Sequence, residues 1–316
     1  MLALIFPGQG SQRPAMGVPW QAHPSWAVVD HLSQTTGRDI SHLLVEADAE
    51  ELRATRNAQL ATYALSLVAL DAARRGPLAE WEPERLAAAA GHSLGEYSAL
   101  VAAGALEASA GARLVQARGD AMQAAADSNP GTMAAVLGLG MPEVAAACQE
   151  TDGAWVANDN TPAQVVVAGT LAGTDQAGQA ALQRGAKRVI ALQVGGAFHS
   201  PLMQPAQAPL DAAVGRTTFS TSRCPVVANV DARPHTDGFA ALLSAQLCSQ
   251  VRWRESLGAL GALGATLFVE LGPGTELSGM VRRTLPEVAR ANVAGPADLD
   301  ALAVAIDALE GRRRPQ

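Results

Sequence analysis

The pentapeptide Gly91-His92-Ser93-Leu94-Gly95 constrains the fold of this chain more than any other segment. It follows a short apolar run, residues 86–90, and precedes a pattern typical of a helix that continues to about Ala105. A G-x-S-x-G sequence between a strand and a helix predicts a sharp turn that exposes the serine hydroxyl at the end of a sheet. The glycines lack Cβ atoms, so the strand and the helix can approach closely. The segment therefore indicates an α/β protein.

Three further apolar runs are typical of buried strands, and helical patterns separate them. They cover residues 2–6, 225–229 and 266–271. The chain has 316 residues, which suits one large α/β domain that carries a smaller inserted one. We predict a doubly wound α/β core formed by residues 1–129 and 197–316.

The pattern changes after the turn-rich segment 127–131, which is the predicted boundary of a subdomain. Residues 130–196 follow the order strand, helix, strand, strand, helix, strand. The expected strands cover residues 133–138, 154–158, 164–169 and 188–194, and the expected helices cover residues 142–149 and 176–184. This order predicts an inserted ferredoxin-like α+β subdomain.

Charge and composition argue against several classes of protein. The net charge of −7 disfavours binding to nucleic acid. No apolar run approaches the roughly 20 residues of a membrane span, and the amino terminus has no basic leader. The three cysteines have no metal-ligand spacing and suggest reduced thiols. We expect a cytoplasmic protein without a membrane, nucleic-acid or metal partner.

Ser93 is a candidate nucleophile, although a serine at this turn could instead merely cap the helix. A serine nucleophile needs a base, and two histidines follow it, His199 and His235. The segment around His235 predicts an exposed turn. His199 follows an expected strand and two glycines, a position where active sites of doubly wound sheets lie. We therefore favour His199 over its alternative role as a buried structural histidine.

The acid of an ordinary triad has no obvious candidate. The acidic residues between Ser93 and His199 lie in an expected helix, in turns or in the expected insertion, and none lies clearly at a strand end. Because the imidazole Nδ1–H needs only an acceptor, a backbone carbonyl could orient His199 instead.

Several separate motifs, in the same order, resemble those of the malonyl-CoA:acyl carrier protein transacylase family, and the similarity covers nearly the whole chain. The matching segments are Pro7-Gly8-Gln9-Gly10-Ser11-Gln12, Gly91-His92-Ser93-Leu94-Gly95-Glu96-Tyr97, Gln116-Ala117-Arg118-Gly119, Gly196-Ala197-Phe198-His199-Ser200, Asn229-Val230-Asp231-Ala232 and Gly272-Pro273-Gly274. The resemblance implies a hydrolase-like α/β core with an inserted ferredoxin-like subdomain, which agrees with the fold that the pattern predicts.

The resemblance also implies roles for individual residues. Ser93 would carry the acyl group, and His199 would be the general base and acid. The backbone N–H groups of Gln9 and Leu94 would form the oxyanion hole, and the main-chain carbonyl of Gln246 would orient His199. One departure bears on the last role, because Gln250 stands where the family usually has proline.

Three further positions would bind the substrate. In the family, the arginine that matches Arg118 pairs with the free carboxylate of a malonyl group, and a planar guanidinium suits that contact. A solvated helix arginine is the alternative. A phenylalanine directly before the histidine, as at Phe198, resembles the form of this segment in family members that select malonyl groups, because a bulkier α-substituent would crowd against the ring. Asn160 matches a position in the substrate cleft, although its surroundings are also typical of a turn.

The expected activity is transfer of a malonyl group from malonyl-CoA to the phosphopantetheine thiol of an acyl carrier protein, through an acylated Ser93. No metal or redox cofactor is expected, and the family suggests a monomer. The alternatives are a discrete trans-acting acyltransferase of a polyketide synthase, a serine hydrolase of acyl thioesters, and a non-enzymatic docking subunit. Both expected partners are anionic, so local basic residues would receive them, and the candidates are Arg184, Lys187, Arg188, Arg252 and Arg254.

Overall fold

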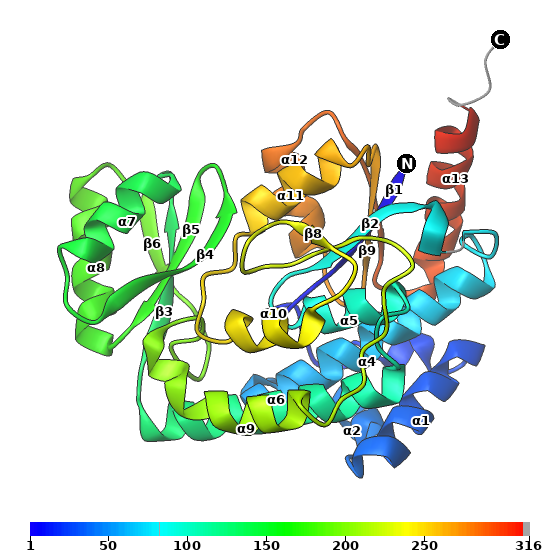
Figure 1. Cartoon of the computed structure of the whole chain (residues 1–316), viewed down its shortest axis with the longest axis horizontal. Coiled ribbons are helices and arrows are strands. Elements are labelled where there is room, and N and C mark those ends of the chain that lie inside the picture. The colour runs from blue at the N-terminus through cyan, green and yellow to red at the C-terminus, as the bar shows by residue number, and fades with distance from the viewer. Residues whose placement is uncertain (82, 312–316) are drawn as a thin grey trace.

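The structure is a computed structural model, and it describes residues 1–81 and 83–311. In these residues the strands form two sheets, which lie side by side in Figure 1. The large sheet has the strand order β10-β9-β1-β2-β7-β8. Its strands are β1 (Leu2–Phe6), β2 (Leu86–Gly91), β7 (Val226–Val227), β8 (Pro234–His235), β9 (Leu267–Leu271) and β10 (Ala289–Val293). All neighbours are parallel except the edge pair β7 and β8.

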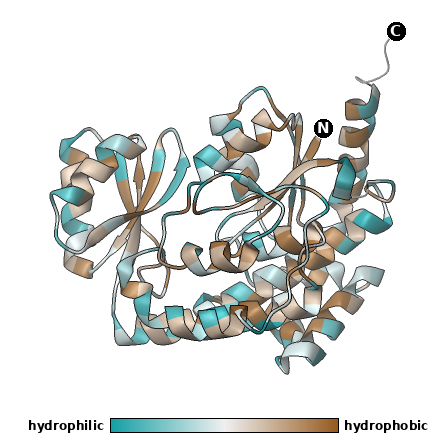
Figure 2. Cartoon of the chain, viewed as in Figure 1, coloured by the Kyte–Doolittle hydropathy of each residue, from teal (hydrophilic) through white to brown (hydrophobic). Residues whose placement is uncertain are grey.

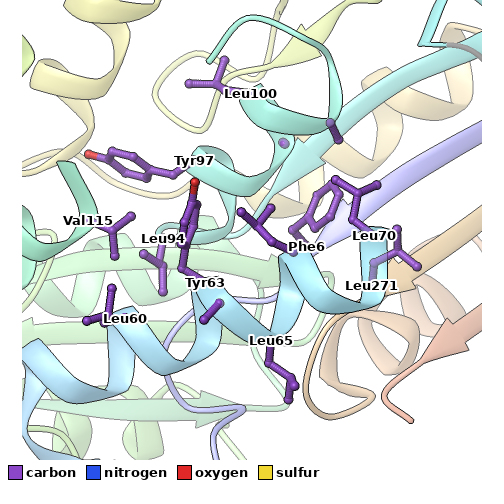
Figure 3. Packing of buried hydrophobic residues seen from close by; sticks show 14 of the residues in the cluster. Phe6, Leu60, Tyr63, Leu65, Leu70, Leu94, Tyr97, Leu100, Val115 and Leu271 are labelled. Atoms are coloured by element: carbon purple, nitrogen blue, oxygen red, sulfur yellow. The ribbon is translucent and has the colours of Figure 1, made fainter. Parts of the chain in front are cut away.

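Helices cover both faces of the large sheet, because its central strands direct apolar side chains to both faces. Phe6 of β1 packs with residues of α4 (Thr55–Arg75), α5 (Gly95–Ala102) and α6 (Ala108–Ser128) (Figure 3), and Leu4 belongs to the same apolar cluster. Ile5 belongs instead to the cluster that includes residues of α11 (Trp253–Ala262) and α12 (Glu276–Thr284). The hydropathy colours of Figure 2 show the same apolar interior.

The core helices are α1 (Ala27–Thr36), α2 (Ile40–Val45), α3 (Ala49–Arg53), α4 (Thr55–Arg75), α5 (Gly95–Ala102), α6 (Ala108–Ser128), α9 (Gln207–Val214), α10 (Phe239–Gln246), α11 (Trp253–Ala262), α12 (Glu276–Thr284) and α13 (Leu299–Gly311). Short 3-10 helices cover Val18–Trp20, Pro24–Trp26, Pro83–Arg85, Pro201–Ala206 and Pro296–Asp298.

The small sheet is antiparallel, with the order β4-β5-β3-β6. Its elements are β3 (Thr132–Leu137), α7 (Met141–Gln149), β4 (Ala154–Thr161), β5 (Gln164–Gly169), α8 (Leu171–Gln183) and β6 (Arg188–Ala191). The two helices cover one face, where Val136, Val165 and Val167 form a separate apolar cluster. The opposite face, with Met133 and Val166, joins the main core.

The elements expected from the sequence are present, with some changes of boundary. Strand β4 continues to Thr161 instead of ending at residue 158, and α8 begins at Leu171 because the Thr170 side chain caps it. Strand β10 had no prediction. None of the helices in the described part of the chain combines the length and apolar character that crossing a membrane requires.

Candidate active site

The turn between β2 and α5 places Ser93 at the carboxyl end of a central strand, in a left-handed backbone conformation with φ 51°. The glycines on either side are sterically required. A Cβ on Gly91 would lie 1.8 Å from the Gly95 carbonyl carbon, and a Cβ on Gly95 would lie 2.1 Å from the Phe6 oxygen. The elbow expected from the pentapeptide is therefore present, and such strain is typical of functional sites.

Ser93 and His199 come together although 106 positions separate them in the chain. Ser93 Oγ lies 2.7 Å from His199 Nε2, and His199 is also left-handed, with φ 59°. His235 lies elsewhere, half-buried in the edge strand β8, where its Nε2 is 2.9 Å from Asp231. It does not occupy the exposed turn that the sequence predicts. The structure thus pairs Ser93 with His199 and not with His235.

Two backbone carbonyls, and not one, face the other side of the imidazole ring. His199 Nδ1 lies 3.2 Å from the Gln246 oxygen and 3.1 Å from the Ser249 oxygen. Because carbonyls only accept, Nδ1 carries the hydrogen and leaves the Nε2 lone pair facing Ser93. Gln250 lies in the same loop and still leaves the Gln246 carbonyl directed at His199.

Arg118 projects from α6 into the site and is 1% exposed. Its guanidinium donates to Gln59 Oε1 at 2.7 Å, to Ser93 Oγ at 3.0 Å and to Gln246 Oε1 at 3.2 Å. Among the residues that the structure describes, its Nε has no acceptor and no carboxylate lies within 4 Å of it. Arg118 is therefore a buried cation with neutral partners, and the alternative of a solvated helix arginine is wrong.

These groups open into a pocket between the two sheets. The segments around the large sheet contribute Gln9, Ser93, Arg118, Phe198 and His199, and the small sheet contributes Met133, Ala135, Asn158, Asn160 and Val166. The described residues contain no cluster of three metal-ligating side chains. The arrangement provides a nucleophile, a base and a fixed positive charge around one cavity, which suits acyl transfer from a substrate that carries an anionic group.

A family model described as the acyl transferase domain matches residues 3–309. The chain belongs to the acyl transferase domain family. The malonyl CoA-acyl carrier protein transacylase of Bacillus subtilis (strain 168) is 39% identical over 293 residues, which cover 89% of this chain and 90% of that relative.

Two solved structures show the same similarity. The acyl-carrier-protein S-malonyltransferase of Burkholderia pseudomallei 1710b has a TM-score of 0.90 at 36% identity and covers 95% of this chain and 99% of its own. A malonyl-transacylase in complex with its type II polyketide synthase acyl-carrier protein has a TM-score of 0.89 at 33% identity, over 96% of this chain and 99% of its own.

The remaining candidate site residues of this acyltransferase lie in the wall of the same pocket or beside it. Asn160 belongs to strand β4 and not to a turn, and its Oδ1 lies 2.9 Å from His92 Nε2. Phe198 is buried directly before His199. Gln9 lines the pocket from the loop after β1, and Leu94 directly precedes the first residue of α5.

Burial shapes the charge states of the site. Burial, together with the nearby charge of Arg118, lowers the pKa of His199 to about 3. His199 is therefore neutral at physiological pH and able to accept a proton. Burial also lowers the pKa of the Arg118 guanidinium, which nevertheless stays charged because an arginine pKa starts so high.

Sequence reasoning missed several residues of the site. Ser249 contributes only its backbone carbonyl, which leaves no signature in the sequence. Asn229 accepts the Ser93 N–H with its Oδ1 at 2.6 Å, and Gln59 accepts from Arg118. The only available signal was that Asn229 begins one of the matching motifs.

The five basic residues considered for anionic partners divide into two groups. Arg184 pairs with Glu150, Arg252 with Glu255, and Arg254 with Asp159. Lys187 and Arg188 are exposed at the start of β6.

Proposed function

We propose that this acyltransferase moves a malonyl group from malonyl-CoA to the phosphopantetheine thiol of an acyl carrier protein. The observation that carries the proposal is the buried Arg118 guanidinium, 3.0 Å from Ser93 Oγ and without a carboxylate partner among the described residues. A malonyl ester on Ser93 would bring a free carboxylate to this cation, and leaving such a charge unpaired is costly. The names of the related proteins support the same substrate and acceptor.

The reaction proceeds in two halves that share one set of residues. Ser93 Oγ attacks the thioester carbonyl while His199 Nε2 takes the hydroxyl proton. The N–H groups of Gln9 and Leu94 stabilise the oxyanion, an effect worth about 3 kcal/mol for one essential donor. The C–S bond then breaks, and His199 gives its proton to the departing CoA thiolate.

The second half reverses these steps. His199 removes the proton of the pantetheine thiol, and the thiolate attacks the carbonyl carbon of the malonyl ester. The bond between that carbon and Ser93 Oγ then breaks, and His199 returns the proton to Ser93 Oγ. The carbonyls of Gln246 and Ser249 hold Nδ1–H throughout. Arg118 and Asn160 orient the malonyl group, and Phe198 limits space beside it. No bond is oxidised or reduced, so the transfer balances without a redox cofactor, and no step requires a metal.

The architecture of the proposed enzyme follows from the two sheets. We assign residues 1–129 and 197–316 to a hydrolase-like catalytic domain and residues 130–196 to a ferredoxin-like subdomain. The parallel large sheet and the order β4-β5-β3-β6 support this assignment. We further propose that the enzyme is a cytoplasmic monomer.

A second candidate function differs only in the carrier protein that accepts the malonyl group. A discrete acyltransferase that serves a polyketide synthase would use the same residues, and the relative solved with a type II polyketide carrier protein favours it. The hydrolase alternative gains no support, because Arg118 suits a malonyl carboxylate and, within residues 1–81 and 83–311, backbone carbonyls and no carboxylate face His199 Nδ1.

The test is to incubate the protein with labelled malonyl-CoA and to map the adduct by mass spectrometry. We expect stoichiometric label on Ser93, discharged by an added carrier protein faster than by water, and no label on Ser93→Ala. Label on another residue would overturn the nucleophile assignment. Discharge at the same rate with and without carrier protein would indicate a hydrolase.

A further inference from the structure

A buried carboxyl group lies directly behind the elbow, and the mechanism above does not use it. Glu96 belongs to the first turn of α5, three positions after Ser93, and is 2% exposed. Its Oε2 accepts hydrogen bonds from the Asn229 N–H at 2.8 Å and from Gln246 Nε2 at 3.0 Å. A buried carboxyl group is costly unless it is hydrogen-bonded, so these two contacts explain how Glu96 is tolerated.

Both donors to Glu96 also hold the peptide groups of Ser93. Asn229 Oδ1 accepts the Ser93 N–H at 2.6 Å, and Gln246 Nε2 donates to the Ser93 carbonyl at 3.0 Å. The peptide groups on either side of the strained Ser93 Cα therefore depend on side chains from other parts of the chain. The Asn229 backbone N–H and the Gln246 side chain converge on one oxygen atom of Glu96.

We propose that Glu96 is a positioning residue, which anchors Asn229 and Gln246 and so holds Ser93 where its hydroxyl meets His199. The inference deepens the proposed function and rests on it for the choice of malonyl-CoA as one probe. The same anchor reaches the rest of the site through Gln246. The Gln246 carbonyl faces His199, and its Oε1 accepts from Arg118.

The anchor works through an acceptor oxygen and does not require a full charge. Burial raises the pKa of Glu96 to about 7, and the Asn229 and Gln246 donors and the Arg118 charge oppose that rise, while Asp231 adds to it. Oε2 can accept both hydrogen bonds whether or not the other oxygen carries a proton. A glutamine at this position should therefore still serve as an anchor.

The experiment compares Glu96→Gln, which keeps an acceptor oxygen, with Glu96→Met, which removes it at nearly the same length. Ser93 labelling is followed with malonyl-CoA and with a fluorophosphonate, which needs the Ser93–His199 pair but carries no carboxylate. Glu96→Met should slow both reactions about 10²-fold, the usual effect of misplacing a reacting group by about 1 Å. Glu96→Gln should stay within about fivefold of the wild type, as one altered neutral hydrogen bond allows.

Glu270 offers a matched control. It is a second fully buried carboxyl group, on β9, and it accepts the N–H groups of Leu277 at 3.1 Å and Ser278 at 2.7 Å. Glu270→Met should lower the melting temperature about as much as Glu96→Met. Both labelling rates, per folded molecule, should stay at the wild-type level in the Glu270 variant.

Three results would overturn the inference. The first is equal labelling rates in Glu96→Met and Glu270→Met, and the second is a Glu96→Gln variant as slow as Glu96→Met. The third is a loss with malonyl-CoA alone, which would limit Glu96 to supporting Arg118. If Glu96→Met does not fold, Asn229→Ala removes one arm of the same frame and should slow both probes, and unchanged rates would again contradict it. A wild-type protein that reacts with fluorophosphonate but not with malonyl-CoA would refute the proposed function and leave this test intact.

Discussion

The two sheets hold their parts of the site in different ways. In the large domain, Ser93, His199 and Arg118 are each bonded to groups from at least two other segments. The small sheet lines the pocket from β3, β4 and β5, and β4 links it to the large sheet's side of the site, because Asn160 contacts His92 and the neighbouring Asp159 pairs with Arg254. The difference suggests that the large domain fixes the reacting atoms, whereas the small sheet closes the pocket over them.

The first prediction tests the large domain and carries the largest expected effect. His199→Ala should lower the single-turnover rate of Ser93 malonylation by about 10³-fold or more, because His199 is the only base in contact with Ser93 Oγ in the part of the chain that the structure describes. Rapid-quench mass spectrometry measures this rate. His235→Ala is the control and should keep the wild-type rate, since His235 lies in β8 against Asp231. A small loss in His199→Ala would mean that the 2.7 Å contact is not catalytic.

Arg118→Ala should separate binding of the acid group from the chemistry. Malonyl transfer should fall about 10²-fold, the usual range for losing a charge-assisted hydrogen-bond pair. Acetyl transfer should be spared or should rise, because Arg118 no longer donates to Ser93 Oγ. Initial rates with malonyl-CoA and acetyl-CoA provide the measurement, and Arg113→Ala, exposed on the same helix, is the control. Equal losses for both substrates would count against the carboxylate contact.

The sequence predicted the elbow and the central strands well because their residues are apolar on both faces and bounded by glycine. Strand β10 was missed because most of it lies half-exposed or exposed at the sheet edge, so its pattern is not that of a buried strand. Strand β4 was ended too early because Asn158, Asp159 and Asn160 have the composition of a turn. Their polarity has another cause, since Asn158 and Asn160 line the pocket and Asp159 pairs with Arg254.

The active site was predictable only in part, because some of its contacts join segments that lie far apart in the sequence. Ser93 and His199 could be selected from local pattern, whereas Arg118 and Gln246 needed the family resemblance. The Ser249 carbonyl and the convergence of Asn229 and Gln246 on Glu96 depend on how distant segments meet. Spacing along the chain does not encode such meetings.

The contact between β4 and the segment at the start of α11 gives the last prediction, which has the smallest expected effect on activity. Arg254 holds Asp159 through both carboxylate oxygens, and the backbone of β4 bonds to Val251 beside them. Asp159 is 1% exposed, whereas the Arg254 side chain is 36% exposed. The two partners should therefore respond differently to loss of the pair, because only arginine can turn toward water.

Arg254→Gln should destabilise the protein by about 3 kcal/mol, since it leaves a buried carboxylate without its cation. Asp159→Asn should cost about 1 kcal/mol, and the double variant should resemble Asp159→Asn because the amide removes the uncompensated charge. Urea unfolding measures these values. Arg252→Gln is the control and should change stability by less than about 0.5 kcal/mol. Arg252 directly precedes α11, its partner Glu255 lies in the first turn of that helix, and both side chains are 39% exposed.

The values of KM and kcat for Arg254→Gln show whether the contact between Arg254 and Asp159 affects substrate binding or the chemical step. If the small sheet closes the pocket, Arg254→Gln should raise the KM for malonyl-CoA several-fold and leave kcat nearly unchanged. The reacting atoms keep their partners within the large domain, so uniform binding is lost while transition-state stabilisation is kept. A fall in kcat as large as the rise in KM would show that the small sheet also positions Ser93 or His199, and the contrast between the two sheets would then be wrong.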